Sequence, residues 1–321
     1  MGKTILIIFT GGTITMSSDE MKTKSILHDN HLELLEKIRP KIPEAEFEFI
    51  LYSVLPSPSI TPNDMLEIGK IIDREYKNKK IDGVVITHGT DTLEETAYFL
   101  DLYTDLPIPI VLTGSMRSFD EFGYDGLSNL ISAILVALDP NSADRGVLVC
   151  LNDEINSAVE VQKTHTIALD TFKSLEFGPL GIVDERTVHY YREATYKNET
   201  IKPTSINKKV EIVKVVSGSD GEIIDYYIDK GVNGLVIEAL GRGNVTVAVA
   251  NKIKDAIANN IAVVITSRCP MGMVKGSYSY EGGGYHLRKL GTLSGSSLTS
   301  EKARLKLLLA LSANLDPKDY F

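Results

Sequence analysis

Threonine hydroxyls in two glycine turns are the first candidates for chemistry in this sequence. Thr13 ends the turn TGGT at residues 10–13, and Thr90 lies within HGTDT at residues 88–92. A threonine hydroxyl becomes an effective nucleophile when a neighbouring group takes its proton. The glycines let the backbone adopt angles that other residues avoid, and let a ligand approach the main chain. Each turn alone is also typical of an ordinary strand-to-loop connection, but the recurrence of a Gly-Thr turn indicates a catalytic site.

Each turn follows a short apolar run that predicts a buried strand. Residues 4–9 and 82–87 are rich in branched aliphatic side chains and too short for a typical helix. Unbroken apolar runs favour strands covered on both faces of a parallel sheet, and such strands carry ligands at their carboxyl ends. We therefore expect both turns at one edge of the same sheet. Apolar residues recur at helical spacing after the second turn, where Asp91 or Thr92 can cap a helix.

Lys163 and Asp91 are the candidates for activating one of these hydroxyls. A buried lysine can act as a base in its neutral form, and a nearby carboxylate can hold and orient it. From residue type alone, an exposed surface position is the more frequent one for lysine, and Asp91 could serve only as a helix cap. Residue types therefore leave both roles open.

The two threonine turns together resemble the paired signatures of the bacterial-type L-asparaginase family. Their order and spacing within one chain make a chance match improbable. Further segments fit the same family and extend the similarity over nearly the whole chain: residues 113–117 (TGSMR), 145–153, 163–166 (KTHT), 178–181 (GPLG) and 302–304 (KAR).

The resemblance implies hydrolysis of the side-chain amide of L-asparagine to L-aspartate and ammonia through an acyl-enzyme. It implies that Thr13 is the nucleophile and Thr90 the second essential threonine. It also implies that Lys163 is the catalytic lysine and that Asp91 binds the substrate's α-amino group. The expected substrate-binding residues are Gly12, Ser57, Ser59, Thr90, Asp91, Ser115 and Arg242. Backbone N–H groups near the two turns are expected to stabilise the oxyanion.

Three features depart from the periplasmic branch of that family. That branch has a tyrosine in a flexible loop beside the nucleophile, whereas residues 2–51 contain no tyrosine. Pro58 follows Ser57 where that branch often has glutamine, so Ser59 is the nearby hydroxyl that could compensate. Arg242 stands where that branch places an asparagine. The combination favours the cytoplasmic branch and leaves open how the loop assists the nucleophile.

Composition favours a protein of the cytoplasm that acts on small molecules. The 321-residue chain has a net charge of −9 and no run of basic residues, which argues against nucleic-acid or anionic-membrane partners. No apolar run is long enough for a signal-peptide core or a membrane span. Cys150 and Cys269 are expected to be buried free thiols. No HExxH motif or complete dinucleotide turn occurs, so we expect neither a metal nor a cofactor.

Helix and strand patterns predict two α/β domains. Residues 1–191 alternate strands and helices and then form hairpins around Lys163, and the resemblance implies a larger, mainly parallel flavodoxin-like domain. Residues 192–209 are polar and form the expected linker. Residues 210–321 predict a smaller parallel α/β unit, which the resemblance implies is a Rossmann-like domain. A polar loop at residues 17–30 is placed to act as a lid over the first turn.

Two other functions and an oligomeric state follow from the same resemblance. One alternative is a glutamine-deaminating enzyme of the kind that supplies ammonia for transfer-RNA amidation. Enzymes of that kind carry an additional N-terminal domain, whereas the first strand here is expected near residue 4. The other alternative is a catalytically silent amino-acid-binding protein, against which the retained threonines and lysine argue. The resemblance also implies a homodimer or homotetramer with active sites shared between subunits. The tyrosines and glycines of residues 277–285 are also typical of a surface loop, but they favour this stretch as the one that completes the shared site.

Overall fold

The computed structural model describes residues 2–16, 29–78, 80–195 and 199–321. The chain forms two compact units, residues 1–200 and 201–321. The division falls inside the segment expected to be a linker, whose extent stays a prediction. The expected lid at residues 17–30 lies outside the described residues, apart from the backbone of residues 29 and 30, which begin helix α1.

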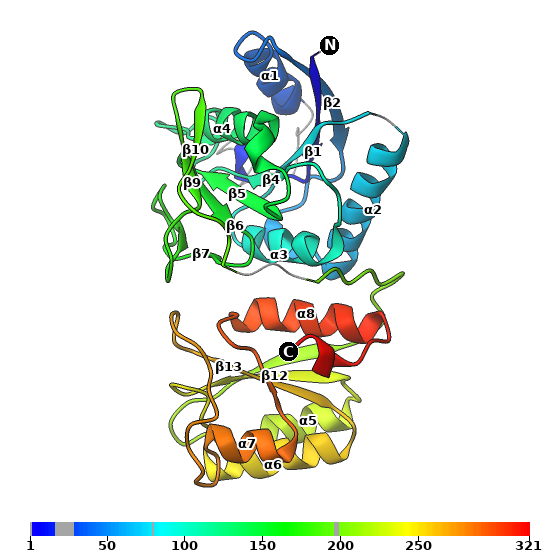
Figure 1. The fold of residues 1–321 in the computed structure, drawn as a ribbon, viewed down its shortest axis with the longest axis vertical. Coiled ribbons are helices and arrows are strands. Elements are labelled where there is room, and N and C mark those ends of the chain that lie inside the picture. Colours follow the sequence, from blue (N-terminus) through cyan, green and yellow to red (C-terminus); the bar gives the residue numbers. More distant parts are fainter. Residues whose placement is uncertain (1, 17–28, 79, 196–198) are drawn as a thin grey trace. The chain divides into compact units, whose positions relative to one another are not determined.

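The first unit is built on an eight-stranded sheet in the described part of the chain, with the order β10-β9-β6-β5-β4-β3-β1-β2 (Figure 1). Strands β2, β1, β3, β4 and β5 are parallel, in the flavodoxin order, whereas β6, β9 and β10 continue the sheet with antiparallel pairs. The mainly parallel sheet expected from the apolar runs is therefore confirmed. The strands are β1 (Lys3–Phe9), β2 (Ala45–Leu51), β3 (Gly83–Thr87), β4 (Ile110–Thr113), β5 (Val147–Leu151), β6 (Glu154–Ser157), β9 (Gly181–Asp184) and β10 (Thr187–Tyr190).

Helices cover both faces of this sheet because the central strands are apolar on both sides. Ile5, Ile7 and Phe9 of β1 join one core with α1 and α4, whereas Leu6 and Ile8 are buried on the opposite face. Helices α2 and α3 pack against each other, and Figure 1 shows them on the side of the sheet away from α4. The helices are α1 (Asp29–Ile38), α2 (Pro62–Asn78), α3 (Leu93–Tyr103) and α4 (Gly126–Leu138).

A small antiparallel pair carries Lys163 out of the main sheet. Strand β7 (Val161–Lys163) pairs with β8 (Phe172–Ser174), and Lys163 is opposite Phe172 at the end of that pair. The hairpins expected around Lys163 are confirmed. β7 also contacts helix α3, which follows the second threonine turn.

The second unit contains a four-stranded parallel sheet in the order β11-β12-β13-β14. Helix α8 forms a core with one face, and α5, α6 and α7 supply the core on the other. Helix α7 and the two-residue strand β14 were not expected. The glycines before α7 indicate a loop, and Leu287 alone is buried in that helix, so its sequence shows no apolar repeat. The elements are β11 (Val210–Lys214), α5 (Glu222–Asp229), β12 (Gly234–Ala239), α6 (Val247–Ala258), β13 (Ala262–Ser267), α7 (Gly284–Leu290), β14 (Leu293–Ser294) and α8 (Ser300–Ser312).

The two cysteines differ in their surroundings. Cys150 is a buried free thiol on β5, and burial raises its pKa. Cys269 is also free but exposed, so the expectation that both thiols are buried is wrong for this residue. It follows the end of β13, where the chain leaves the sheet. Within the described ranges, no helix has the length and apolar character needed to cross a membrane.

Candidate active site

The two threonine turns meet at a reversal in the strand order of the first sheet. The chain runs from β1 to β2 on one side and later returns to place β3 on the other side of β1. Phe9 and Thr87 are paired at the carboxyl ends of these strands, and the Thr10 N–H donates to the Thr87 carbonyl at 3.2 Å. Ligands of open α/β sheets bind at such reversals, so the expected position of the site at this edge has a structural basis.

Close glycine contacts hold the two turns and a third segment together. Gly12 has a φ of 87° and a ψ of 174°, and a Cβ there would lie 2.4 Å from the Gly89 nitrogen. Such angles are essentially restricted to glycine. A Cβ on Gly89 would in turn lie 2.8 Å from the Ser57 hydroxyl oxygen. Three segments distant in sequence are therefore in contact, because two of them lack side chains at the contact points.

Thr13 opens a short 3₁₀ turn, η1 (Thr13–Thr15), and its side chain is half-buried. Gly12 precedes the turn, and its carbonyl accepts the Thr15 N–H at 3.2 Å. The neighbouring Thr10 hydroxyl donates to the Thr87 carbonyl at 2.9 Å. The Thr10 hydroxyl therefore joins the two strands. Thr13 is the next threonine of the motif and lies after the end of β1, in the turn η1.

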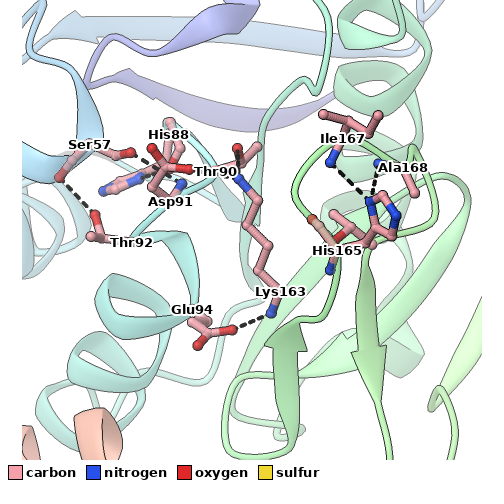
Figure 2. A network of polar contacts seen from close by, with 12 residues as sticks. Ser57, His88, Thr90, Asp91, Thr92, Glu94, Lys163, His165, Ile167 and Ala168 are labelled. Carbon is pink, nitrogen blue, oxygen red and sulfur yellow. Dashed lines mark hydrogen bonds and ion pairs between the residues drawn. The ribbon is translucent and has the colours of Figure 1, made fainter.

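Lys163 brings the second threonine and the carboxylate together. Its Nζ donates to Thr90 Oγ1 at 2.9 Å and to Asp91 Oδ1 at 2.7 Å (Figure 2). The lysine side chain is 16% exposed and that of Asp91 is 62% exposed, whereas Thr90 is buried. Lys163 is therefore no free surface lysine. The ammonium is shielded on its hydroxyl side, and the carboxylate is open to solvent or to a ligand.

Two contacts fix the backbone that carries Lys163. The Lys163 N–H donates to Glu94 Oε2 from the first turn of α3 (Figure 2). Two residues further on, His165 Nδ1 accepts the N–H groups of Ile167 and Ala168, each at 3.1 Å. Glu94 was not expected to belong to the site, because an acidic residue in the first turn of a helix is already accounted for by the helix dipole.

Ser57 contacts the second threonine turn through both its side chain and its carbonyl. It opens the short turn η2 (Ser57–Ser59) and is buried. Its hydroxyl accepts the Asp91 N–H at 3.2 Å, and its carbonyl accepts the Thr92 hydroxyl at 2.8 Å. Thr92 is the N-cap residue of α3 but makes no side-chain cap, so the expected capping hydrogen bond is absent. The Ser59 side chain is exposed, and its substrate role stays a prediction.

The remaining candidates lie in different surroundings. The Ser115 hydroxyl is buried and donates to Asp125 Oδ1 at 2.7 Å, so its contacts are internal to the loop after β4. Arg242 is exposed in the second unit, in the turn closed by the bridge between Leu240 and Asn244. Substrate binding by either residue stays a prediction. Among the described residues, no cluster of His, Cys, Asp or Glu is arranged to hold a metal ion.

His88 joins the second threonine turn to helix α3. The buried imidazole contacts the Gly89 carbonyl through Nδ1 at 2.7 Å and the Thr96 hydroxyl through Nε2 at 2.9 Å. Burial lowers the pKa of His88 to about 4, although the bond to Gly89 opposes this shift. The imidazole is therefore neutral near pH 7. With a carbonyl at Nδ1, the proton lies on Nδ1 and Nε2 accepts from Thr96.

Fold and site together define a two-domain α/β protein with a threonine, lysine and carboxylate cluster at the strand reversal of its larger sheet. Residues 4–196 match the family described as Asparaginase, N-terminal, and residues 209–320 match the Glutaminase/Asparaginase C-terminal domain. The chain belongs to the asparaginase family.

Three similar proteins agree with this membership. An L-asparaginase of Bacillus licheniformis is 36% identical, with 98% of this chain and 97% of that protein covered. A component of the glutamyl-tRNA(Gln) amidotransferase of Methanobrevibacter smithii is 32% identical, with 97% of this chain and 73% of that component covered. The crystal structure of a probable cytoplasmic L-asparaginase from Campylobacter jejuni has a TM-score of 0.86 and 32% identity, covering 99% of this chain and 98% of that one.

Proposed function

We propose that this chain hydrolyses the side-chain amide of L-asparagine to L-aspartate and ammonia. The contact of Lys163 Nζ with both the Thr90 hydroxyl and the Asp91 carboxylate carries this proposal. It joins a proton-transfer group to a hydroxyl at the edge of the sheet where the Thr13 turn also begins. Family membership and the full-length similarity to an L-asparaginase support the substrate.

In the first half-reaction, the Thr13 oxygen attacks the amide carbon of the substrate. The Thr13 proton is transferred to the amide nitrogen, the carbon–nitrogen bond breaks, and ammonia leaves an aspartyl ester on Thr13. Backbone N–H groups near Gly12 and Thr90 stabilise the charge that develops on the carbonyl oxygen. The close contact between Gly12 and Gly89 supports this role, because it brings the two N–H-bearing turns together.

In the second half-reaction, a water molecule hydrolyses the ester. The Lys163 amine takes a proton from the water through the Thr90 hydroxyl while the water oxygen bonds to the ester carbon. The same proton then passes to the Thr13 oxygen as the ester bond breaks. Asp91 keeps the lysine in place by accepting a hydrogen bond from Nζ at 2.7 Å. This carboxylate is also open enough to bind the α-ammonium group of the substrate.

Substrate orientation is assigned to groups at the same edge. Ser57 binds the α-carboxylate. Its hydroxyl accepts the Asp91 N–H, which places it next to the residue that binds the α-ammonium group. Ser59 and Arg242 are further candidates for substrate binding. The buried hydroxyl of Ser115 contributes through the loop that it stabilises.

Ammonia release by purified protein tests the function against its alternatives. With L-asparagine, we expect turnover that is lost in Thr13→Ala and in Thr90→Val, while both variants keep the wild-type melting temperature. Turnover of L-glutamine alone would favour the glutamine-deaminating alternative, in keeping with the similarity to the amidotransferase component. Binding of either amino acid without ammonia release would favour a silent binding protein.

A cytoplasmic homo-oligomer with shared sites is the state that we assign to the working enzyme. The similarity to a probable cytoplasmic L-asparaginase supports the compartment. Exposed rings of Tyr278, Tyr280 and Tyr285 support a contact through residues 277–285, because aromatic side chains are enriched at interfaces. Inactive Thr13→Ala protomers mixed with an inactive variant of that loop should regain part of the activity on exchange. No recovery after demonstrated exchange would contradict shared sites.

A further inference from the structure

Two carbonyl groups in and next to the turn that carries Thr13 accept hydrogen bonds from another loop. Within the turn, the Gly12 carbonyl accepts from Thr15 and the Thr13 carbonyl accepts from Met16, each at 3.2 Å. The next carbonyls have partners about a hundred residues away. The Tyr124 hydroxyl donates to the Ile14 carbonyl at 2.6 Å, and the Phe119 N–H donates to the Met16 carbonyl at 2.9 Å. Residues 115–125, here called the clamp loop, therefore hold the turn from outside.

The clamp loop is itself fixed by one carboxylate. Asp125 accepts the Ser115 hydroxyl at 2.7 Å and the N–H groups of Met116 and Arg117, each at 3.0 Å. The Asn129 amide donates to the same carboxylate at 2.9 Å. Charged acceptors with several donors make strong, well-oriented hydrogen bonds. The loop is therefore a rigid support between β4 and α4.

Tyr124 is placed to act through its hydroxyl. Its ring meets the Phe119 ring edge to face, with centroids 5.2 Å apart. A Cβ on Gly126 would lie 2.3 Å from the Tyr124 hydroxyl, so glycine at this position leaves room for it. Burial raises the pKa of Tyr124, and the nearby Asp125 and Glu33 carboxylates raise it further. The phenol therefore stays protonated and serves as a hydrogen-bond donor.

We propose that Tyr124 is a positioning residue for the Thr13 nucleophile. Its bond to the Ile14 carbonyl fixes the Ile14–Thr15 peptide unit, inside the three-residue turn that Thr13 opens, and so limits rotation of that turn. Attack on an amide carbon requires the nucleophile within a narrow range of positions, and a displacement of about 1 Å costs on the order of 100-fold in rate. This inference rests on the proposed role of Thr13.

Tyr124→Phe removes the hydroxyl and keeps the ring, and Tyr190→Phe is the matched control. Tyr190 also bonds through its hydroxyl at 2.6 Å, to Ser142, but it lies on the edge strand β10 at the far side of the sheet. We expect Tyr124→Phe to lower kcat with L-asparagine by about tenfold, with KM little changed, because a freed turn samples displaced positions. The control should keep wild-type kcat.

The pH dependence of kcat separates positioning from proton transfer. Removing a donor that stays protonated lowers kcat by the same factor at every pH. Tyr124→Phe should therefore keep the shape of the wild-type pH profile. Gly126→Ala is a second perturbation, since its methyl displaces the hydroxyl while the tyrosine remains. It should lower kcat in the same way. Equal kcat in Tyr124→Phe and Tyr190→Phe, at matched melting temperatures, would overturn the proposal.

Thr13→Ala, measured alongside, shows which assumption has failed. If Thr13→Ala is inactive and Tyr124→Phe is as fast as the control, the positioning role is wrong and the nucleophile assignment stands. If Thr13→Ala keeps wild-type turnover, the nucleophile assignment is wrong and the positioning role is overturned with it. A profile that changes shape in Tyr124→Phe would instead assign the phenol a part in proton transfer and contradict positioning.

Discussion

Replacing Gly12 by alanine should separate the two threonine turns. The alanine Cβ would lie 2.4 Å from the Gly89 nitrogen and 2.5 Å from its Cα. These are backbone atoms, so no flexible side chain can move aside. The added methyl must push one turn away from the other, and the left-handed φ of 87° adds strain of its own.

The size of the effect follows from the contact distance. Opening the 2.4 Å contact to an ordinary separation near 3.4 Å moves the turns apart by about 1 Å. A misplacement of about 1 Å costs on the order of 100-fold in rate, or about 2.7 kcal/mol of barrier. Backbone angles restricted to glycine add a stability cost of about 1–3 kcal/mol.

Steady-state ammonia release and urea unfolding measure the two parts separately. Gly218→Ala is the matched control, because its φ is 82° and nothing lies within 4 Å of the added Cβ. It should lose stability and keep wild-type kcat/KM. We expect Gly12→Ala to lose about 100-fold in kcat/KM. A Gly12→Ala enzyme with the kcat/KM of the control would refute the view that this contact sets the catalytic geometry.

Three further predictions concern the groups around Lys163 and the second turn. Lys163→Met should lower kcat by about 10²–10⁴ with a smaller effect on KM, because proton transfer acts in the transition state; a change in KM alone would make the lysine a binding residue. Glu94→Ala should lower kcat about tenfold by freeing the Lys163 backbone, and Glu94→Gln should restore most of it, since its amide oxygen still accepts the Lys163 N–H; equal rates in the two variants would contradict this. The folded pKa of His88, about 4, lies below its unfolded value of 6.5, so the stability from neutral His88 is present above pH 6.5 and is lost as the pH falls toward 4. Urea unfolding of His88→Gln should show a correspondingly weaker loss over this window, and an unchanged pH dependence would refute the assignment.

Local sequence patterns predicted the frame of the site because the relevant signals lie within single elements. The aliphatic run before Thr10 identifies β1, and the apolar residues at helical spacing after the second threonine turn identify α3. Parallel strands place both threonine turns at one sheet edge, as the site requires. The catalytic roles predicted for Thr13 and Lys163 rest on the family resemblance, since residue type alone favours a surface position for a lysine.

The contacts that fix the site could not be predicted, since they join distant residues. Glu94 is 69 positions from the Lys163 N–H that it accepts, and Tyr124 is 110 positions from the Ile14 carbonyl. Thr92 has the residue type of a helix cap, but its hydroxyl bonds to the Ser57 carbonyl, because that acceptor is brought into reach by the fold. Such competition between local and long-range partners is invisible in one sequence.

Trapping of the acyl-enzyme tests the role of Thr13 most directly. Wild-type protein and the Lys163→Met variant would be mixed with L-asparagine, quenched in acid during turnover, digested and mapped by mass spectrometry. We expect an aspartyl ester on the peptide containing Thr13, with more of it in Lys163→Met if deacylation is the slower step, and none in Thr13→Ala. An ester on Thr90, or aspartate formation by Thr13→Ala at the wild-type rate, would contradict Thr13 as the nucleophile.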